Sequence, residues 1–197
     1  MYKSEQLAKL VEANNGYLLT SAAQKAEISR TYLLDFVKAN DYERAANGVD
    51  VSPTTLVDPC YVLQLTSNAI IASHESSAYL YGLTPREPYQ ETVTVKQGYN
   101  ASHLKKKNVK VYYSRHQNFE LGATTIKTFF GNIVSAYDMD RTICDFIAHK
   151  KDLEIQTFET AIKTYMSSRY KNLIKLMKYA KALKIEPAVR IYTEVML

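Results

Sequence analysis

The chain contains no tryptophan, only two cysteines among its 197 residues, and no run of eighteen apolar residues. A chain without such a run is not expected to have a membrane-spanning helix. Its first residues, MYKSEQLAKL, lack the apolar centre of a secretory signal. Cys60 and Cys144 lie far apart and in no metal-binding spacing, which is typical of buried thiols in a reducing compartment. We therefore expect a cytoplasmic protein with no membrane partner.

The motifs of several enzyme classes are missing as well. The chain has no phosphate-binding loop, no dinucleotide-binding fingerprint and no serine-hydrolase signature. His74 beside Glu75 could form an acid–base pair, but polar residues at the start of a helix are the simpler interpretation. We therefore predict no enzyme, with no catalytic residue, no metal and no cofactor. The four histidines, which fall in no ligand spacing, are His74, His103, His116 and His149.

Apolar residues make up 46% of the sequence, enough to form a folded core. The formal charge of +5 is unevenly distributed along the chain. Residues 1–52 hold six Lys and Arg against seven Asp and Glu, whereas the remaining residues hold nineteen against thirteen. A polyanionic partner would therefore be attracted mainly by the C-terminal part of the chain.

The first 52 residues predict three helices and a hairpin. A first helix is expected from Ser4 to about Asn14, a second opens at Thr20 or Ser21, and Ser29 caps a third. Alanines on the second helix allow a neighbouring helix to cross closely. Asn47-Gly48 is a two-residue turn typical of a β-hairpin. This order describes a winged helix-turn-helix, whose tight corner directs the third helix outward into a major groove.

The third helix and the hairpin supply the predicted DNA contacts. Residues in the first turn of the helix would reach base edges and phosphates, and the hairpin tip would reach the adjacent backbone or minor groove. A three-helix protein-interaction module with the same core is the alternative. The low charge of this segment predicts that it holds DNA only weakly by itself. The predicted DNA-binding residues are Ser29, Arg30, Thr31, Tyr32, Lys38, Arg44 and Asn47.

Residues 53–58, bracketed by Pro53 and Pro59, are predicted to form a hinge between a domain at 1–52 and a second domain at 59–197. The second domain is expected to be strand-rich over 59–137 and to end in a bundle-like helical segment over 138–197. Helices are expected over 60–65 and 75–83. The expected strands are 91–95, 109–115, 124–130 and 132–137, the last two forming a hairpin. The expected fold class is α+β.

Asp138 and Asp140 resemble the paired carboxylates that bridge Mg²⁺ in nucleotidyl transfer. The simpler interpretation is that Asp138 ends a strand and caps the following helix. Arg141 and Asp145 lie four residues apart. They are expected to form a surface ion pair on that helix, contributing about a few tenths of a kcal/mol.

Two groups of lysines in the second domain are candidate contacts for phosphates or for an acidic protein surface. Either group could equally be a solvated face. One group is adjacent in sequence to two tyrosines, and the other lies opposite the apolar stripe of a helix. The two groups are Lys105, Lys106, Lys107 and Lys110, and Lys171, Lys175, Lys178 and Lys181.

Several stretches of the chain resemble the AbiEi family of antitoxins. They are SHESSAYLYGLTPREP, TVTVKQGYN, VSAYDMDRTICDFI and YAKALKIEPAVRIYTEVML, together with the N-terminal helices and the Asn47-Gly48-Val49 hairpin. The most specific parts are Ala78–Leu83 and Asp140–Asp145. Many relatives have an aromatic residue where this chain has Asp50, a departure that bears on the packing of the hairpin.

This resemblance implies a function. Members of the family belong to bacterial abortive-infection systems that act against phage. They repress their own operon by binding inverted repeats in its promoter, and they counteract a nucleotidyltransferase-like toxin without forming a stable complex with it, the behaviour called type IV. By this resemblance the chain would be a monomer or weak dimer, with two copies on double-stranded DNA.

Two other functions are consistent with the sequence. One is a metal-dependent nucleotidyltransferase that uses Asp138 and Asp140, and the other is a one-component transcriptional regulator whose C-terminal domain senses a small ligand. On the preferred interpretation, the uneven charge predicts that residues 1–52 alone bind operator DNA far more weakly than the full chain.

Overall fold

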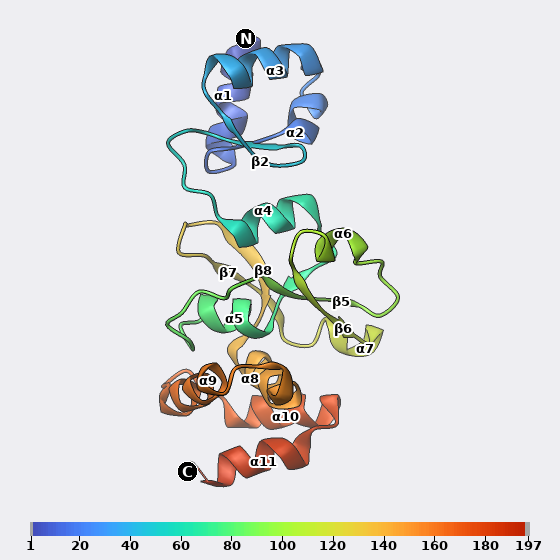
Figure 1. The fold of residues 1–197 in the computed structure, drawn as a ribbon, viewed down its shortest axis with the longest axis vertical. Coiled ribbons are helices and arrows are strands. Elements are labelled where there is room, and N and C mark those ends of the chain that lie inside the picture. Colours follow the sequence, from blue (N-terminus) through green and yellow to red (C-terminus); the bar gives the residue numbers. More distant parts are fainter. Residues whose placement is uncertain (1, 196–197) are drawn as a thin grey trace. The chain divides into compact units, whose positions relative to one another are not determined.

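The computed structural model describes residues 2–195, and the chain divides into two compact units (Figure 1). The N-terminal unit ends at Asn68 and also includes the short segment Phe129–Asn132. The C-terminal unit contains Ala69–Thr128 and continues from Ile133. Helices and strands are mixed in both units, which confirms the α+β class.

In the described residues of the N-terminal unit, from residue 2 on, there are four helices and a three-stranded antiparallel sheet with the order β1-β3-β2. Its first three helices and its β2–β3 hairpin follow one another in the order that the sequence predicted. The elements are α1 (Lys3–Ala13), β1 (Tyr17–Leu19), α2 (Thr20–Lys25), α3 (Arg30–Ala39), β2 (Glu43–Ala46), β3 (Val49–Val51) and α4 (Pro59–Thr66).

The corner between α2 and α3 is tight because the backbone reverses within four residues. Glu27 has a positive φ of 58°, and the amide of Ile28 donates to the carbonyl of Ala23. Ala23 is completely buried, so the helices approach closely over a methyl group. The surrounding core consists of Leu7, Leu18, Ala23, Ile28 and Leu33.

The β1–β3–β2 sheet has two covered faces. Successive residues of a strand point to opposite faces, and accordingly Leu18 joins the core beneath α1–α3, whereas Tyr17 and Leu19 join a second cluster. That second cluster contains Val62 of α4, and the ring of Tyr61 lies 5.2 Å from that of Tyr17. Thus α4 covers the face of the sheet that the first three helices leave open.

This packing moves the boundary that the sequence predicted. Residues 53–58 were expected to be a hinge, with a second domain starting at residue 59, but α4 belongs to the N-terminal unit and the division follows Asn68. The physical reason is that Tyr17, Val49 and Val51 present apolar side chains that α4 buries. A segment ending at residue 52 would leave these side chains in water.

The C-terminal unit is built on a five-stranded mixed sheet with the order β6-β5-β4-β8-β7. β4 pairs antiparallel with β5 and parallel with β8, β5 pairs parallel with β6, and β7 and β8 form an antiparallel hairpin. The strands are β4 (Ile71–Ala72), β5 (Thr92–Lys96), β6 (Lys110–Ser114), β7 (Ala123–Lys127) and β8 (Ile133–Tyr137).

Four helices, α8 to α11, lie together on one side of this sheet and, with α5, form the main core of the unit (Figure 1). Residues buried in this core include Phe146, Phe158, Ile162, Tyr165 and Leu176. No helix in the described part of the chain is long and apolar enough to cross a membrane. The helices are α5 (His74–Leu80), α6 (Ser102–Lys105), α7 (His116–Phe119), α8 (Met139–Ala148), α9 (Ile155–Ser167), α10 (Leu173–Leu183) and α11 (Glu186–Val195).

The four strands predicted in this unit are present as β5 to β8, but some of their bounds differ. β7 ends at Lys127, not at residue 130, because Phe129–Asn132 leave the sheet and join the N-terminal unit. The sequence did not predict β4, α6 or α7, each of which has only two to four residues. Such short elements carry too few residues to show a period.

Candidate nucleic-acid interface and a buried polar network

The first turn of α3 is exposed at the surface of the N-terminal unit. Ser29 caps the helix, its hydroxyl accepting from the amide of Tyr32 at 3.3 Å, as predicted. Arg30 and Thr31 are exposed, and Tyr32 is half-buried, with Lys3 Nζ 5.8 Å from the centre of its ring. The opposite side of α3 is anchored in the core through Leu33. The helix therefore holds its polar first turn in a fixed, accessible position.

The β2–β3 hairpin carries the other predicted contacts. Asn47 is exposed at its tip, and Gly48 has a φ of +75°, which suits the two-residue turn. Arg44 lies directly opposite Asp50 across the hairpin and its Nε donates to the Asp50 carboxylate. Asp50 is only 2% exposed, whereas the Arg44 side chain remains 54% exposed.

The Arg44–Asp50 ion pair explains how the hairpin accommodates an acidic residue at this position. The buried carboxylate is paired with the cross-strand guanidinium, on a side chain that stays 54% exposed. Arg44 is therefore a structural residue as well as a predicted DNA contact. Lys38 is exposed near the end of α3, so every predicted DNA-binding residue except the half-buried Tyr32 is exposed.

The two lysine groups of the C-terminal unit are not one surface. Lys105, Lys106 and Lys107 are exposed on α6 and just after it, whereas the second group is on and just before α10, which lies apart from α6 (Figure 1). Lys110 Nζ donates to the Asp152 carbonyl at 3.0 Å and lies 3.7 Å from Glu75 Oε2. These contacts engage Lys110 within the protein, so it is a poor candidate for phosphate binding.

Lys175 is also engaged internally. Its Nζ lies 2.8 Å from Asp138 Oδ2 and 3.4 Å from Asp140 Oδ2, between the two carboxylates. This arrangement raises the pKa of Lys175, because the hydrogen bond and the negative charge of Asp138 outweigh desolvation. Of the predicted lysines, this leaves Lys105, Lys106, Lys107, Lys178 and Lys181 exposed, with Lys171 half-buried.

The carboxylates of Asp138 and Asp140 have structural partners. Asp138 caps α8 as predicted, its Oδ1 accepting from the amide of Arg141 at 2.8 Å. Asp140 Oδ1 accepts from the Tyr165 hydroxyl at 2.7 Å and from the amide of Asn172 at 3.1 Å. Among residues 2–195, no group of three or more His, Cys, Asp or Glu is placed to hold a metal ion. Asp138 and Asp140 thus form a structural pair bridged by Lys175, and they are not two open metal ligands.

Arg141 and Asp145 form a buried ion pair, contrary to the expected surface pair. Arg141 Nε donates to Asp145 Oδ1 at 3.0 Å, and the two residues are 3% and 5% exposed. The guanidinium also lies 4.0 Å from the centre of the Tyr137 ring. Burial raises the pKa of the Asp145 carboxyl, although the charge of Arg141 opposes this shift.

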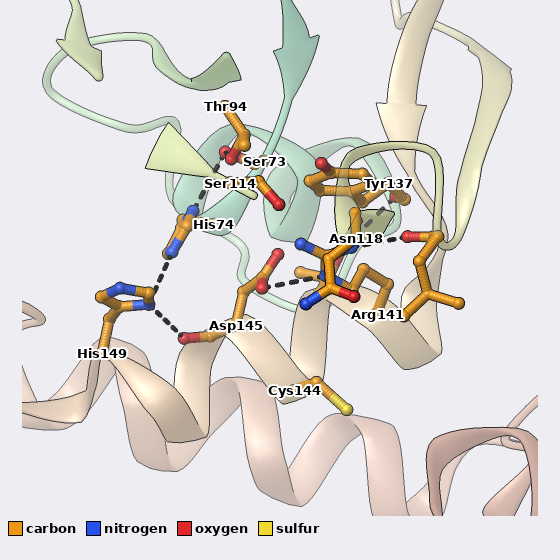
Figure 2. A network of polar contacts seen from close by, with 12 residues as sticks. Ser73, His74, Thr94, Ser114, Asn118, Tyr137, Arg141, Cys144, Asp145 and His149 are labelled. Atoms are coloured by element: carbon orange, nitrogen blue, oxygen red, sulfur yellow. Dashed lines mark hydrogen bonds and ion pairs between the residues drawn. The ribbon is translucent and has the colours of Figure 1, made fainter. Parts of the chain in front are cut away.

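α7 and the loop after it cover this ion pair. Arg141 Nη1 donates to the carbonyls of Asn118 and Leu121, at 2.9 and 2.6 Å (Figure 2). Gly122 has a φ of +79°, and a Cβ on it would lie 2.6 Å from Arg141 Cβ. Glycine therefore allows the loop to approach α8 closely, and the guanidinium binds one carbonyl in α7 and one in the loop.

The Arg141–Asp145 ion pair is part of a larger network of polar contacts. A second set of its contacts joins α5 to the end of α8 (Figure 2). His74 is 1% exposed; its Nδ1 lies 3.0 Å from Ser73 Oγ and its Nε2 lies 3.1 Å from His149 Nδ1. The ring of His74 stacks on that of Tyr112 with centres 3.5 Å apart. His149 Nδ1 also lies 3.2 Å from the Asp145 carbonyl oxygen.

The hydrogen bonds assign the tautomers of both rings. A carbonyl oxygen only accepts, so His149 Nδ1 carries the hydrogen and shares it between the Asp145 carbonyl and His74 Nε2. His74 Nδ1 then donates to Ser73 Oγ, which also accepts from the Thr94 hydroxyl at 2.9 Å. Desolvation and the nearby His149, Arg141 and Lys110 lower the pKa of His74 well below its usual value. His74 is therefore neutral at physiological pH.

This network connects α5 to α8. Ser73, His74 and Asp145 are buried, whereas His149 is half-buried. Sequence reasoning missed the network, because His74 and His149 are 75 residues apart and no local spacing links them. Cys60 and Cys144 are buried and form no disulfide, as predicted.

Together the two units define an α+β protein with an exposed helix N-terminus on the first unit and a buried polar network in the second. No protein-family model and no curated protein matches the sequence. Among solved structures, the chain is similar to the RV2827C protein from Mycobacterium tuberculosis, with a TM-score of 0.52 and 10% sequence identity. The match covers 96% of this chain and 79% of that one. At this identity the likeness concerns the fold alone.

Proposed function

We propose that this protein is a DNA-binding repressor and antitoxin of a bacterial toxin–antitoxin system, as its resemblance to the AbiEi family implies. In this proposal the N-terminal unit is a winged helix-turn-helix. Its α3 enters the major groove of promoter DNA and its β2–β3 hairpin contacts the adjacent backbone. Two copies bind inverted repeats and repress the operon in the cytoplasm.

The exposed first turn of α3 is the observation that best supports DNA binding. Arg30 and Thr31 are exposed one turn from the buried Leu33, so the helix is fixed while its polar end is open to a partner. The free amides at the start of a helix favour negatively charged groups such as phosphates. An arginine at this end can also make a two-pronged contact with a guanine edge.

The proposed functional partner is a nucleotidyltransferase-like toxin, which the C-terminal unit opposes without a stable complex. The metal-dependent nucleotidyltransferase alternative has less support. Lys175 occupies the space between Asp138 and Asp140, and Tyr165 and Asn172 donate to Asp140. Carboxylates with such partners would have to lose them before binding Mg²⁺.

DNA binding is tested by Arg30→Ala. We expect this variant to bind a fragment of its own promoter about 5- to 150-fold more weakly, corresponding to about 1–3 kcal/mol for the loss of one good base contact. The measurement is a gel shift or fluorescence anisotropy titration at fixed salt. Lys9→Ala, which removes an exposed charge from α1, is the matched control. Equal affinity of the Arg30→Ala variant and the parent protein would show that α3 does not read DNA.

The antitoxin role is tested separately in cells. If a nucleotidyltransferase reading frame lies beside this gene, its induction should arrest growth, and co-expression of this chain should restore it. Arg30→Ala should still restore growth when both genes are driven by foreign promoters, because neutralisation is assigned to the C-terminal unit. Growth arrest that this chain does not relieve would refute the antitoxin role while leaving DNA binding intact.

A further inference from the structure

The C-terminal unit has a pocket formed by α9, α11 and the 3₁₀ turn Lys150–Asp152, which follows α8. We call it the α9–α11 pocket. Its volume is about 300 Å³, at the lower end of the range of about 300–1,000 Å³ that is usual for small-molecule sites. None of the predicted site residues lines it, so this pocket is separate from the proposed DNA contacts.

The deepest part of the pocket is apolar and belongs to the main core of the unit. Phe158 and Ile162 of α9 line the pocket and are buried in that core. The ring of Tyr192, on α11, meets the Phe158 ring edge-on with centres 5.5 Å apart. Because these side chains are fixed by packing between two helices, the apolar floor of the pocket is formed before any ligand arrives.

Two isoleucines extend the apolar floor outward to the solvent. Ile155, at the start of α9, and Ile191, on α11, line the pocket and are 54% and 62% exposed. Burying exposed apolar side chains such as these is favourable, in proportion to the apolar area that leaves water. A ligand with an apolar body would bury both side chains and the floor together.

The charged side chains of the pocket leave one cation unpaired. Lys163 Nζ lies 3.6 Å from Glu159 Oε2, so these two charges offset each other. Lys150 has no ion-pair partner among residues 2–195. Its Nζ lies 5.0 Å from the centre of the Phe158 ring and 5.7 Å from that of Tyr192. An ammonium group is thus held beside the apolar floor with its charge unpaired within the described chain.

This combination restricts the chemistry of the ligand. A carboxylate would pair with Lys150, and an aliphatic chain would cover Ile155 and Ile191. An amine with the same chain would be repelled by Lys150. An anion without an apolar body would gain only one exposed ion pair, which contributes little by itself. A nucleic acid would find a single unpaired cation here, whereas its binding requires several.

We propose that the α9–α11 pocket binds a small aliphatic carboxylate, with the carboxylate at Lys150 and the chain against Phe158 and the two isoleucines. This inference goes beyond the proposed function and does not depend on it, because binding is measured without DNA and without a toxin. Such a site is what a ligand-sensing regulator would need in its C-terminal domain.

The test measures the affinity of the full chain for straight-chain carboxylates from acetate to octanoate by isothermal titration calorimetry. We expect affinity to rise by up to about fourfold for each CH₂ group added, as the chain fills the apolar part of the pocket. Acetate should show no measurable binding. Octylamine, which has the same chain and the opposite charge, should bind at least about fivefold more weakly than octanoate, because it cannot pair with Lys150.

The binding site is located by methyl NMR of isoleucine-labelled protein. Octanoate should shift the methyl signals of Ile155 and Ile191. The signal of Ile133, a 58% exposed isoleucine on β8 that does not line the pocket, should stay in place.

Two variants separate the charge of the pocket from its apolar surface. Lys150→Met keeps the aliphatic stem but removes the charge, so it should weaken octanoate binding about fivefold and abolish the preference over octylamine. Lys151→Met, at the next residue of the turn and outside the lining of the pocket, is its matched control. Ile191→Ser should weaken octanoate binding about fourfold and leave the preference unchanged, with Ile133→Ser as its control.

Several results would overturn the proposal. They are no binding of octanoate at millimolar concentration, an affinity that does not rise with chain length, methyl shifts at Ile133 in place of Ile191, or equal losses in Lys150→Met and Lys151→Met. Lys150 and Ile191 are exposed, so both pocket variants should fold, which circular dichroism will verify. If one of them fails to fold, the other still decides the result.

Discussion

His74 is buried and uncharged, and its backbone lies in the left-handed region with a φ of 48°, which is uncommon for a residue other than glycine. Its ring is hydrogen-bonded on both nitrogens, to Ser73 and to His149, and is stacked on Tyr112. Because every polar atom of the ring already has a partner, a proton on Nε2 would disrupt the bond from His149. His74 should therefore make the stability of the protein depend on pH.

The sign of that dependence follows from the lowered pKa of His74. In the unfolded chain a histidine takes up a proton below about pH 6.5, whereas in the folded chain His74 does so only at a lower pH. Between these two values the unfolded state binds more protons. Stability is therefore lost as the pH falls, by up to about 1.4 kcal/mol per pH unit.

We predict that His74→Asn removes this part of the pH dependence. Asparagine tolerates a positive φ and keeps a hydrogen-bond donor. The variant should lose less stability than the parent protein between pH 7 and pH 5, as measured by urea unfolding. His103→Asn, at an exposed position on α6, should behave like the parent protein. Identical pH profiles for the parent protein and His74→Asn would contradict the assignment of a neutral, buried imidazole. Asp145, whose raised pKa acts in the opposite direction, is common to all three proteins.

At the scale of elements, two ion pairs with the same sequence spacing have different environments. Arg141–Asp145 on α8 and Glu186–Arg190 on α11 are both four residues apart. In the first pair the side chains of Arg141 and Asp145 are 3% and 7% exposed, whereas in the second those of Glu186 and Arg190 are 35% and 56% exposed. Spacing predicts that both pairs form, but only the tertiary fold determines that α7 and the loop after it cover the first.

We predict that Arg141→Met destabilises the protein by about 3–5 kcal/mol, because it leaves the buried Asp145 carboxylate without its partner. It also removes the donor to the Asn118 and Leu121 carbonyls. Arg190→Met should cost no more than about 0.5 kcal/mol. Urea unfolding of both variants is the measurement, and Arg141→Met combined with Asp145→Leu should recover part of the loss. Equal small effects of the two single substitutions would mean that Arg141 is hydrated in solution.

The same contrast shows what the sequence could and could not predict about the elements. Local signals were sufficient for the Ser29 and Asp138 caps and for the Asn47-Gly48 turn, because each depends on residues within one turn of the backbone. They were not sufficient for α4, whose partner face on the sheet is formed by Tyr17, Val49 and Val51. Nor could they place Asn132 against Asp58, a contact across 74 residues.

At the scale of the whole molecule, the charge separates more strongly between the observed units than between the predicted domains. The N-terminal unit holds six Lys and Arg against eight Asp and Glu, a net −2, and the remaining residues hold nineteen against twelve, a net +7. If the protein binds DNA through α3, the sequence-independent attraction must come mainly from the C-terminal unit. A truncation at residue 52 is a poor test of this, because it would also remove α4 from the core.

Substitutions in the full chain give a cleaner test. We predict that replacing Lys105, Lys106 and Lys107 by Gln lowers the slope of log affinity against log salt by about 0.9 for each phosphate contact removed. The affinity should fall by the same factor on operator and unrelated DNA, since phosphate contacts carry no sequence information. Lys163→Gln is the control, because Lys163 lies on α9, outside both lysine groups, and its Nζ is 3.6 Å from Glu159 Oε2. Lys178→Gln with Lys181→Gln tests the α10 face in the same way. If neither lysine group changes the slope while Arg30→Ala still weakens binding, the C-terminal unit lies outside the DNA footprint, and the N-terminal unit must hold DNA through the first turn of α3 and the hairpin alone.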